Sequence, residues 1–431
     1  MLCDNISVNQ ENHLTFAGHD TVELAKKYGT PLYLMDENKI RQHVRTYKNA
    51  MEDFFPAGSL PEFASKAFSC KRIYEIMAEE GIDIDVVSCG EIYTAKSVGF
   101  PMERAFFHGN NKTDFDIEYA ITNGVGHFVA DDVTELYAID EVAKKCGVIP
   151  KVLLRLTPGI DPHTHKKIST GSVESKFGIA IETGQADEAV KIALSLSNIE
   201  LCGFHCHIGS QIFESQPFVT AAEIMLKFIA DIRDTLGFTA KILNLGGGFG
   251  VRYVESDPVI DYREKICEVA DKVNEYCEKF GLNVPQIMME PGRSLVADAG
   301  MTLYTVGCVK EVSGYCNYVS IDGGMADNPR YTLYESQYTV INASRASDTA
   351  DYKATVAGRC CESGDLIGED MMLARPKRGE TLAVLTTGAY NYSMASNYNR
   401  IPRPPVVMLN GDKDYVAVRR ETFEDIVSLD E

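Results

Sequence analysis

The sequence predicts an α/β fold in which a closed (β/α)8 barrel precedes a smaller all-β domain. Between about residues 60 and 295, eight short apolar segments alternate with helix-length stretches. Such alternation produces a parallel sheet, and eight parallel strands close into a barrel whose functional groups lie where the strands end. After residue 296 the pattern changes to short β-rich runs bounded by Gly, Pro, Asn and Asp, which is typical of an all-β domain.

Each predicted barrel strand ends in a polar or glycine-rich residue, and amphipathic helices fill most of the gaps. The eight segments are Phe63–Phe68, Asp85–Ser88, Ala105–His108, His127–Asp131, Val152–Arg155, Gly203–His207, Ile242–Gly248 and Ile287–Arg293. Apolar residues at helical spacing predict six helices. These are Ile73–Glu80, Glu91–Val98, Glu135–Lys145, Gln185–Leu196, Pro217–Leu236 and Asp261–Phe280.

The flanking regions suggest three domains or segments. Thr21–Tyr28, stopped by Gly29, predicts a helix, and Pro31–Asp36 predicts a strand outside the eight. We expect residues 1–35 to form an N-terminal segment that packs with the β domain, residues 36–295 to form the barrel, and residues 296–431 to form the β domain. The β runs predict a sandwich or small barrel. They are Thr302–Glu311, Tyr318–Asp322, Tyr338–Ala343, Lys353–Val356, Thr381–Leu385, Val406–Leu409 and Tyr415–Arg419.

Charge and cysteine usage narrow the functional class. A formal net charge of −20 repels phosphate backbones and anionic lipid, which argues against a partner of nucleic acid or membrane. No apolar run approaches the ~20 residues that span a bilayer. Twelve cysteines are scattered without a CxxC pair, and no basic region precedes an apolar stretch at the N-terminus. These features predict a reduced, cytoplasmic compartment in which most thiols are buried.

Lys66 ends the first predicted barrel strand in a largely apolar setting. A lysine kept neutral by desolvation or by nearby cations forms imines readily. Taken alone, the residue fits better with a solvated lysine at a strand end, which is the commoner case.

Four glycines in five positions, at residues 246–250, follow another strand directly. Glycine lets backbone N–H groups approach a phosphate, and Ser210 is placed to donate a further hydrogen bond. The alternative is a tight turn that packs against its neighbour.

Histidine, glutamate and arginine side chains follow two more strands. His205 and His207 lie two apart on one strand and so face one side. His207 suits stacking on an aromatic cofactor, whereas His205 fits a core histidine, and two histidines are too few for a metal site. Glu290 suits a pyridine nitrogen and Arg293 suits a substrate carboxylate. A salt bridge at the barrel rim remains the alternative.

Three loops of the β domain carry further polar groups. The loop Cys360–Asp365 holds thiols, carboxylates, a serine and a glycine, which suits a proton-donor site. The other two loops, Asn328–Tyr334 and Gly388–Ser393, bear tyrosines. Taken singly, each loop fits an ordinary polar turn.

Together these motifs resemble the fold-type III, alanine racemase-like decarboxylases that use pyridoxal 5′-phosphate, and among them the branch that acts on diaminopimelate. The shared elements, in family order, are aromatic-Ala-x-Lys-Ala, His-x-Gly-Ser, Gly-Gly-Gly-x-Gly, Glu-Pro-Gly-Arg, Cys-Glu-Ser-x-Asp and Gly-Ala-Tyr. The resemblance extends from Pro31 to about residue 419. It implies a lyase of lysine biosynthesis that converts meso-2,6-diaminopimelate to L-lysine and CO2.

The resemblance also implies roles for individual residues. Lys66 holds the cofactor, His207 stacks on it, and Cys361 is the proton donor. Cofactor contacts are implied for Lys66, His207, Ser210, Gly247, Gly248, Glu290, Gly292, Arg293 and Tyr390. Substrate contacts are implied for Arg293, Arg330, Tyr334, Glu362 and Tyr390.

The family further implies a head-to-tail homodimer with shared active sites. Cys361, Glu362 and Tyr390 would then extend into the partner's barrel. Several relatives stay open as alternatives: a decarboxylase of ornithine, arginine or carboxynorspermidine, an alanine racemase, or a non-catalytic pyridoxal-phosphate protein. The two arginines of the distal pocket favour diaminopimelate over ornithine, arginine and carboxynorspermidine as the substrate. The thiol at position 361 argues against a racemase, which uses a tyrosine there.

Overall fold

A computed structural model describes residues 2–160 and 175–431 of the chain. The chain divides into two compact units. The barrel unit comprises His43–Gly250 and Ile260–Gly292, and the β-rich unit comprises Met1–Gln42, Val251–Val259 and Arg293–Glu431. Among the described residues, no helix has both the length and the apolar character needed to cross a membrane.

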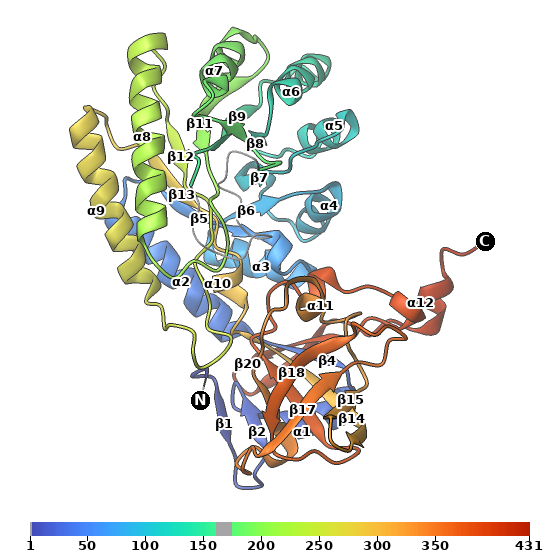
Figure 1. Cartoon of the computed structure of the whole chain (residues 1–431). Coiled ribbons are helices and arrows are strands. Elements are labelled where there is room, and N and C mark those ends of the chain that lie inside the picture. Colours follow the sequence, from blue (N-terminus) through green and yellow to red (C-terminus); the bar gives the residue numbers. More distant parts are fainter. Residues whose placement is uncertain (1, 161–174) are drawn as a thin grey trace. The chain divides into compact units, whose positions relative to one another are not determined.

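Eight parallel strands close into a barrel in the first unit, as the sequence predicts (Figure 1). Each strand pairs with the next along the chain, β8 pairs with β9, and β13 returns to β5, which completes the ring. A short ninth strand, β10 (Ile179–Ala180), lies beside β9 outside the ring. The barrel strands are β5 (Leu60–Ala64), β6 (Asp83–Val86), β7 (Ala105–Phe107), β8 (His127–Ala130), β9 (Lys151–Thr157), β11 (Glu200–His205), β12 (Ile242–Asn244) and β13 (Gln286–Met289).

Helices follow the strands and all six predicted ones are present. Polar caps and glycines set their ends: Asp132 accepts backbone N–H groups at the start of α6, and Gly147, with φ 68°, ends it. Gly203 is required inside β11, because a Cβ there would lie 1.8 Å from the Ile242 carbonyl oxygen of β12. The helices are α2 (Glu37–Phe54), α3 (Lys71–Glu80), α4 (Cys89–Ser97), α5 (Asp114–Thr122), α6 (Val133–Cys146), α7 (Gln185–Ser195), α8 (Gln216–Leu236) and α9 (Tyr262–Phe280).

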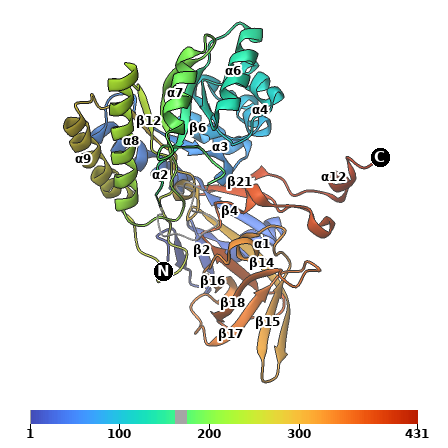
Figure 2. The same ribbon diagram turned by 45° about the horizontal axis from the view of Figure 1, so that its top comes forward.

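The β-rich unit is built on one long strand, β14 (Gly300–Val312), whose two halves pair with different partners (Figure 2). Its first half lies between β4 (Leu32–Asp36) and β19 (Thr381–Leu385), and its second half forms a hairpin with β15 (Cys316–Ile321). The sheet order is β18-β17-β15-β14-β4-β20-β21, with β16 on β19. The remaining strands are β16 (Val340–Asn342), β17 (Tyr352–Ala357), β18 (Leu366–Leu373), β20 (Val406–Asn410) and β21 (Lys413–Val418).

The N-terminal residues share a core with this sheet. A small antiparallel sheet, β1 (Ile6–Val8), β2 (Leu14–Phe16) and β3 (His19–Asp20), precedes α1 (Thr21–Tyr28). Leu14, Phe16 and Leu24 belong to the same buried cluster as Leu303 and Leu385. Three short helices complete the unit: α10 (Arg293–Val296), α11 (Arg330–Tyr334) and α12 (Phe423–Val427).

The expectation that most cysteines are buried is wrong. All twelve are free thiols, of which five are buried, four are half-buried and three are exposed. Cys308 and Cys316 are exposed on the β14–β15 hairpin, where Cys316 pairs with the last residue of β14.

Candidate active site

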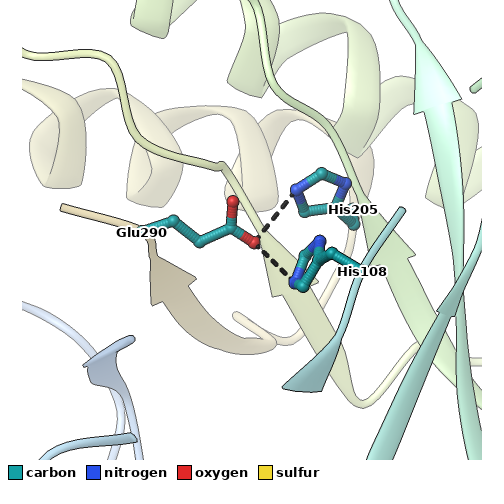
Figure 3. A group of neighbouring side chains, drawn as sticks. All are labelled: His108, His205 and Glu290. Atoms are coloured by element: carbon teal, nitrogen blue, oxygen red, sulfur yellow. Dashed lines mark ion pairs between the residues drawn. The ribbon is translucent and has the colours of Figure 1, made fainter. Parts of the chain in front are cut away.

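A buried carboxylate marks the carboxyl end of the barrel strands. Glu290 follows β13 directly and is 6% exposed. One of its oxygens, Oε1, lies 3.1 Å from Nε2 of His108, after β7, and 3.0 Å from Nε2 of His205, at the end of β11 (Figure 3). The Asn244 amide, from β12, donates a hydrogen bond to the same oxygen at 2.9 Å. Four strand ends therefore converge on one carboxylate oxygen.

Electrostatics keep Glu290 ionised. Burial opposes its ionisation, but the contacts with His108, His205 and His207 outweigh burial and hold the pKa of Glu290 well below its usual range. Burial lowers the pKa of His108 and of His205, against the attraction of Glu290. The site thus presents a fixed anion in a desolvated setting.

Lys66 lies on a single 3-10 turn, Ser65–Ala67, immediately after β5. The prediction of a largely apolar setting is wrong: the Lys66 side chain is exposed, and its charge acts on the carboxyl groups of Asp85 and Glu91. Burial raises the pKa of Asp85, on β6, to about 8, and the nearby Lys66 charge opposes that rise. Burial likewise raises the pKa of Glu91, on α4, again against Lys66. The acids come from β6 and from the helix after it, which sequence spacing about Lys66 did not reveal.

The glycine-rich loop packs tightly on two neighbouring loops. A Cβ on Gly247 would lie 1.9 Å from the Glu290 carbonyl oxygen, and one on Gly248 would lie 2.3 Å from the Gly209 carbonyl oxygen. Ile212 donates its N–H to the Gly248 carbonyl at 2.9 Å, which fixes the loop that carries Ser210 beside the glycine loop. Glycine here serves close backbone packing, and that packing gathers three loops at the strand ends.

His207 is a neutral acceptor in this arrangement. The N–H of Gly247 donates to its Nδ1 at 3.3 Å, so the imidazole proton lies on Nε2. Burial, followed by the charges of Lys66 and Arg155, lowers the pKa of His207 to about 3. The ring stays uncharged at neutral pH, which suits a flat contact with another ring.

The backbone after Glu290 lies against the turn that carries Lys66. A Cβ on Gly292 would approach the Cβ atoms of Ala64 and Ala67 to 2.9 and 3.2 Å, and Ala64 donates its N–H to the Pro291 carbonyl at 3.2 Å. The amine and the carboxylate are therefore tied to one rigid piece of backbone. Pyridoxal phosphate fits this donor set, which offers an amine, a fixed anion, a neutral imidazole and a glycine loop with a neighbouring hydroxyl.

A second group of predicted residues meets in the β-rich unit. Arg293 is 7% exposed, donates to the Tyr253 hydroxyl at 2.7 Å, and lies 4.8 Å from the centroid of the Tyr390 ring. Arg330 is 6% exposed and lies 4.4 Å from the Tyr334 ring and 5.3 Å from the Tyr390 ring. Two buried guanidinium groups therefore flank one tyrosine.

Arg330 forms no ion pair with any residue that the structure describes. Its Nε is buried and has no hydrogen-bond partner within residues 2–160 and 175–431. A buried cation that is not paired by the protein is costly. The arrangement is typical of a site for an anionic ligand group.

The cysteine loop places its two thiols differently. Cys360 is buried and Cys361 is exposed. The carboxylate of Asp365 accepts the backbone N–H groups of Met325 at 2.5 Å and of Cys360 at 2.6 Å. The Gly364 carbonyl accepts the Thr332 hydroxyl of α11 at 2.8 Å. Asp365 thus anchors the loop through hydrogen bonds to the backbone, while Cys361 and Glu362 remain exposed.

Sequence reasoning assigned no role to four residues at the barrel mouth: His108, Asn244, Asp85 and Arg155. His108 and Arg155 end two of the predicted strands, and this position alone indicates that they lie at the barrel mouth. Asn244 ends β12 and Asp85 lies within β6, and only the pairing of the strands brings them toward the mouth. His205, expected to be a core histidine, contacts Glu290.

A barrel that presents an amine, a fixed carboxylate and a glycine loop at its strand ends defines the class of pyridoxal-phosphate-dependent barrel enzymes. The family model described as pyridoxal-dependent decarboxylase, pyridoxal binding domain, matches residues 37–297. The chain belongs to this family, within the diaminopimelate decarboxylases, because several of these are more than 30% identical to it over nearly its whole length.

Three relatives illustrate the similarity. The diaminopimelate decarboxylase of Bacillus subtilis is 47% identical over 424 residues, which cover 98% of this chain and 96% of that protein. The structure of the M. jannaschii diaminopimelate decarboxylase with L-lysine has a TM-score of 0.91 and 34% identity, with coverage of 99% and 98%. The Helicobacter pylori enzyme with L-lysine has a TM-score of 0.86 and 31% identity, with coverage of 95% and 99%.

Proposed function

We propose that the chain catalyses the pyridoxal-phosphate-dependent decarboxylation of meso-2,6-diaminopimelate to L-lysine and CO2. The observation that carries this proposal is similarity to diaminopimelate decarboxylases along essentially the whole chain. Each unit, taken by itself, supports the proposal: the barrel offers an amine, a fixed anion and a glycine loop, and the β-rich unit buries two arginines suited to an acidic ligand group.

The barrel unit would hold the cofactor. Lys66 would bind it covalently through Nζ, and His207 would stack on its ring. The glycine loop, through Gly247 and Gly248, and the Ser210 hydroxyl would bind its phosphate. Gly292, Arg293 and Tyr390 complete the proposed set. When bound, pyridoxal phosphate takes up the electron pair left by the breaking bond between Cα and the carboxylate.

Two residues of the chain govern protons in this scheme. Glu290, held ionised by its neighbours, would keep a proton on the pyridine nitrogen through an ion-pair hydrogen bond. Cys361 would deliver a proton to Cα after CO2 leaves, because it is the exposed thiol of the pair. Asp365, which accepts the backbone N–H groups of Met325 and Cys360, would fix the position of that thiol.

Substrate choice depends on the far end of the molecule. Diaminopimelate carries both an ammonium and a carboxylate there, whereas ornithine ends in an ammonium alone. Arg330, Arg293 and Tyr334 would bind the distal carboxylate, and Glu362 would bind the ammonium beside it. The support for this assignment is that Arg330 is buried and that its Nε has no hydrogen-bond partner among the described residues.

We also propose a homodimer with shared active sites, in which Cys361, Glu362 and Tyr390 extend into the partner's barrel. The exposure of Cys361 and Glu362 in the single chain supports this. A cytoplasmic location is part of the same proposal, and twelve free thiols without a disulfide support a reducing compartment.

The deciding experiment compares substrates on the purified, cofactor-loaded protein. CO2 release is measured with meso-diaminopimelate, ornithine, lysine and arginine at equal concentrations. We expect turnover of meso-diaminopimelate alone, with L-lysine as the amino-acid product. Comparable turnover of ornithine or arginine would assign the chain to an amine-forming branch instead.

A further inference from the structure

A second carboxylate lies behind Glu290 at the barrel mouth. Glu62, in β5, is fully buried. The Asn244 amide joins the two acids, since its Nδ2 donates to Oε1 of Glu62 at 3.0 Å and to Oε1 of Glu290 at 2.9 Å. The Asn244 carbonyl oxygen accepts the Gly246 N–H at 2.8 Å. Every polar hydrogen and the oxygen of this amide are therefore used.

The surroundings of Glu62 contain several other carboxyl groups. Asp83 is its register partner on β6, and Asp85 and Glu290 complete the acids that act on it. Among the described residues, His108 is the basic group within ion-pair distance of it, with Nε2 4.0 Å from Oε2 of Glu62. In the part of the chain that the structure describes, Oε2 of Glu62 accepts no hydrogen bond.

An ionised Glu62 would therefore leave a buried, negatively charged oxygen without a donor. Burying such a charge costs far more than burying a neutral carboxyl group. Desolvation, followed by the negative charge of Glu290, raises the pKa of Glu62 well above its ordinary value. The two acids thus hold opposite states, with Glu290 ionised and Glu62 protonated.

We propose that Glu62 is a positioning residue for Glu290, acting through Asn244, and that it does so as a protonated acid. The proposal rests on the proposed function, in which Glu290 faces the pyridine nitrogen. A neutral Glu62 fixes the Asn244 amide without adding negative charge behind Glu290. Glu290 then keeps both its orientation and its readiness to ionise.

Protonation of Glu62 makes the stability of the folded chain depend on pH, and the variant Glu62→Gln isolates this dependence. Between the unfolded pKa of a glutamate, about 4.3, and the raised folded pKa, the folded chain holds one more proton than the unfolded chain. Stability therefore falls as pH rises through this window. Glu62→Gln keeps the size and a neutral acceptor but never ionises. The unfolding constant of wild type relative to this variant should rise by up to about tenfold per pH unit.

The control for this titration is Glu200→Gln. Glu200 pairs with Lys241 at 2.7 Å at the surface, and this contact lowers the Glu200 pKa. The unfolding constant of wild type relative to Glu200→Gln should not change with pH above pH 5, because the Glu200 carboxyl is ionised in both the folded and the unfolded chain there. A flat ratio for Glu62→Gln as well would overturn the proposal.

Infrared difference spectroscopy tests the protonation state directly. At pH 7, wild type minus Glu62→Gln should show the carbonyl stretch of one protonated carboxyl group, in the protein with and without cofactor. Absence of this band would overturn the proposal. This result does not depend on cofactor binding, so it separates the inference from the proposed function.

The positioning role is tested with ¹⁵N-labelled pyridoxal phosphate. Glu62→Ala removes the acceptor of Asn244, so the pyridine ¹⁵N shift should move toward the unprotonated value and the Kd for the cofactor should rise about tenfold. Glu62→Gln should leave both unchanged. Equal shifts in wild type and Glu62→Ala would refute positioning. Failure of wild type to bind the cofactor would refute the proposed function and leave the infrared result to decide the state of Glu62.

Discussion

Arg330 offers a prediction in which stability and activity move in opposite directions. Its guanidinium is buried against the rings of Tyr334 and Tyr390 and has no carboxylate partner among the described residues. Arg330→Met keeps most of the volume and removes the charge. Replacing an unpaired buried charge with an apolar side chain is often neutral or stabilising. Loss of two cation–ring contacts offsets this by about 0.5–2 kcal/mol, so we expect a change in unfolding free energy within about 1 kcal/mol of zero.

The effect on substrate should be much larger. Removing one partner of a buried charge pair costs about 3–5 kcal/mol, which corresponds to a loss of roughly 10²- to 10³-fold or more in kcat/KM for meso-diaminopimelate. Binding of the cofactor should change little, since the contact is to substrate. Urea unfolding, cofactor titration and steady-state kinetics on the same preparation measure the three quantities.

The matched control is Arg375→Met, in the same unit, where Arg375 forms an exposed ion pair with Glu311. We expect it to change neither activity nor stability by more than about 0.5 kcal/mol. A value of kcat/KM for Arg330→Met within threefold of wild type would refute the assignment. A large loss of stability with unchanged kinetics would show that Arg330 is structural.

Three other predictions concern the cofactor site and the cysteine loop. Borohydride reduction of the loaded protein followed by peptide mapping should label Lys66, and a label on another lysine would contradict its role. Cys361→Ala should lose most turnover while keeping the cofactor spectrum, whereas Cys360→Ala should retain turnover; the reverse outcome would assign the proton donor to Cys360. Because the pKa of His207 is lowered to about 3, stability should fall as pH drops from about 6.5 toward that value, by up to about 1.4 kcal/mol per pH unit. His207→Gln should show a shallower fall in urea titrations from pH 7 to 5, and an unchanged slope would count against a neutral His207.

The barrel was predictable because its signal is local. Each strand is a short apolar run that ends in a polar residue, and the structure has all eight. The element β18 (Leu366–Leu373) was missed, since Glu369 and Asp370 interrupt its apolar pattern and Asp370 has a positive φ of 54°. The helix α5 (Asp114–Thr122) was also missed: it is short, and its Phe115 points to solvent.

The site could be predicted only in part, for a different reason. Lys66, His207, Glu290 and the glycine loop carry motif signals in one stretch of chain each. The contact of Glu290 with His108 joins residues 182 positions apart, and no local pattern reports it. The same holds for the acids around Lys66, which overturned the apolar setting expected for it. The roles assigned to Cys361, Glu362 and Tyr390 remain predictions.

The position of β4 bears on the order in which the chain assembles as it is synthesised. This strand, Leu32–Asp36, lies between β14 and β20 and pairs with both. Its second partner, Val406–Asn410, emerges from the ribosome roughly 370 residues later. The strands of the barrel, by contrast, pair with sequence neighbours, and only the closing pair spans the unit. We therefore expect the barrel to fold during translation, while β4 lacks its strand partners until β14 and then β20 have been made.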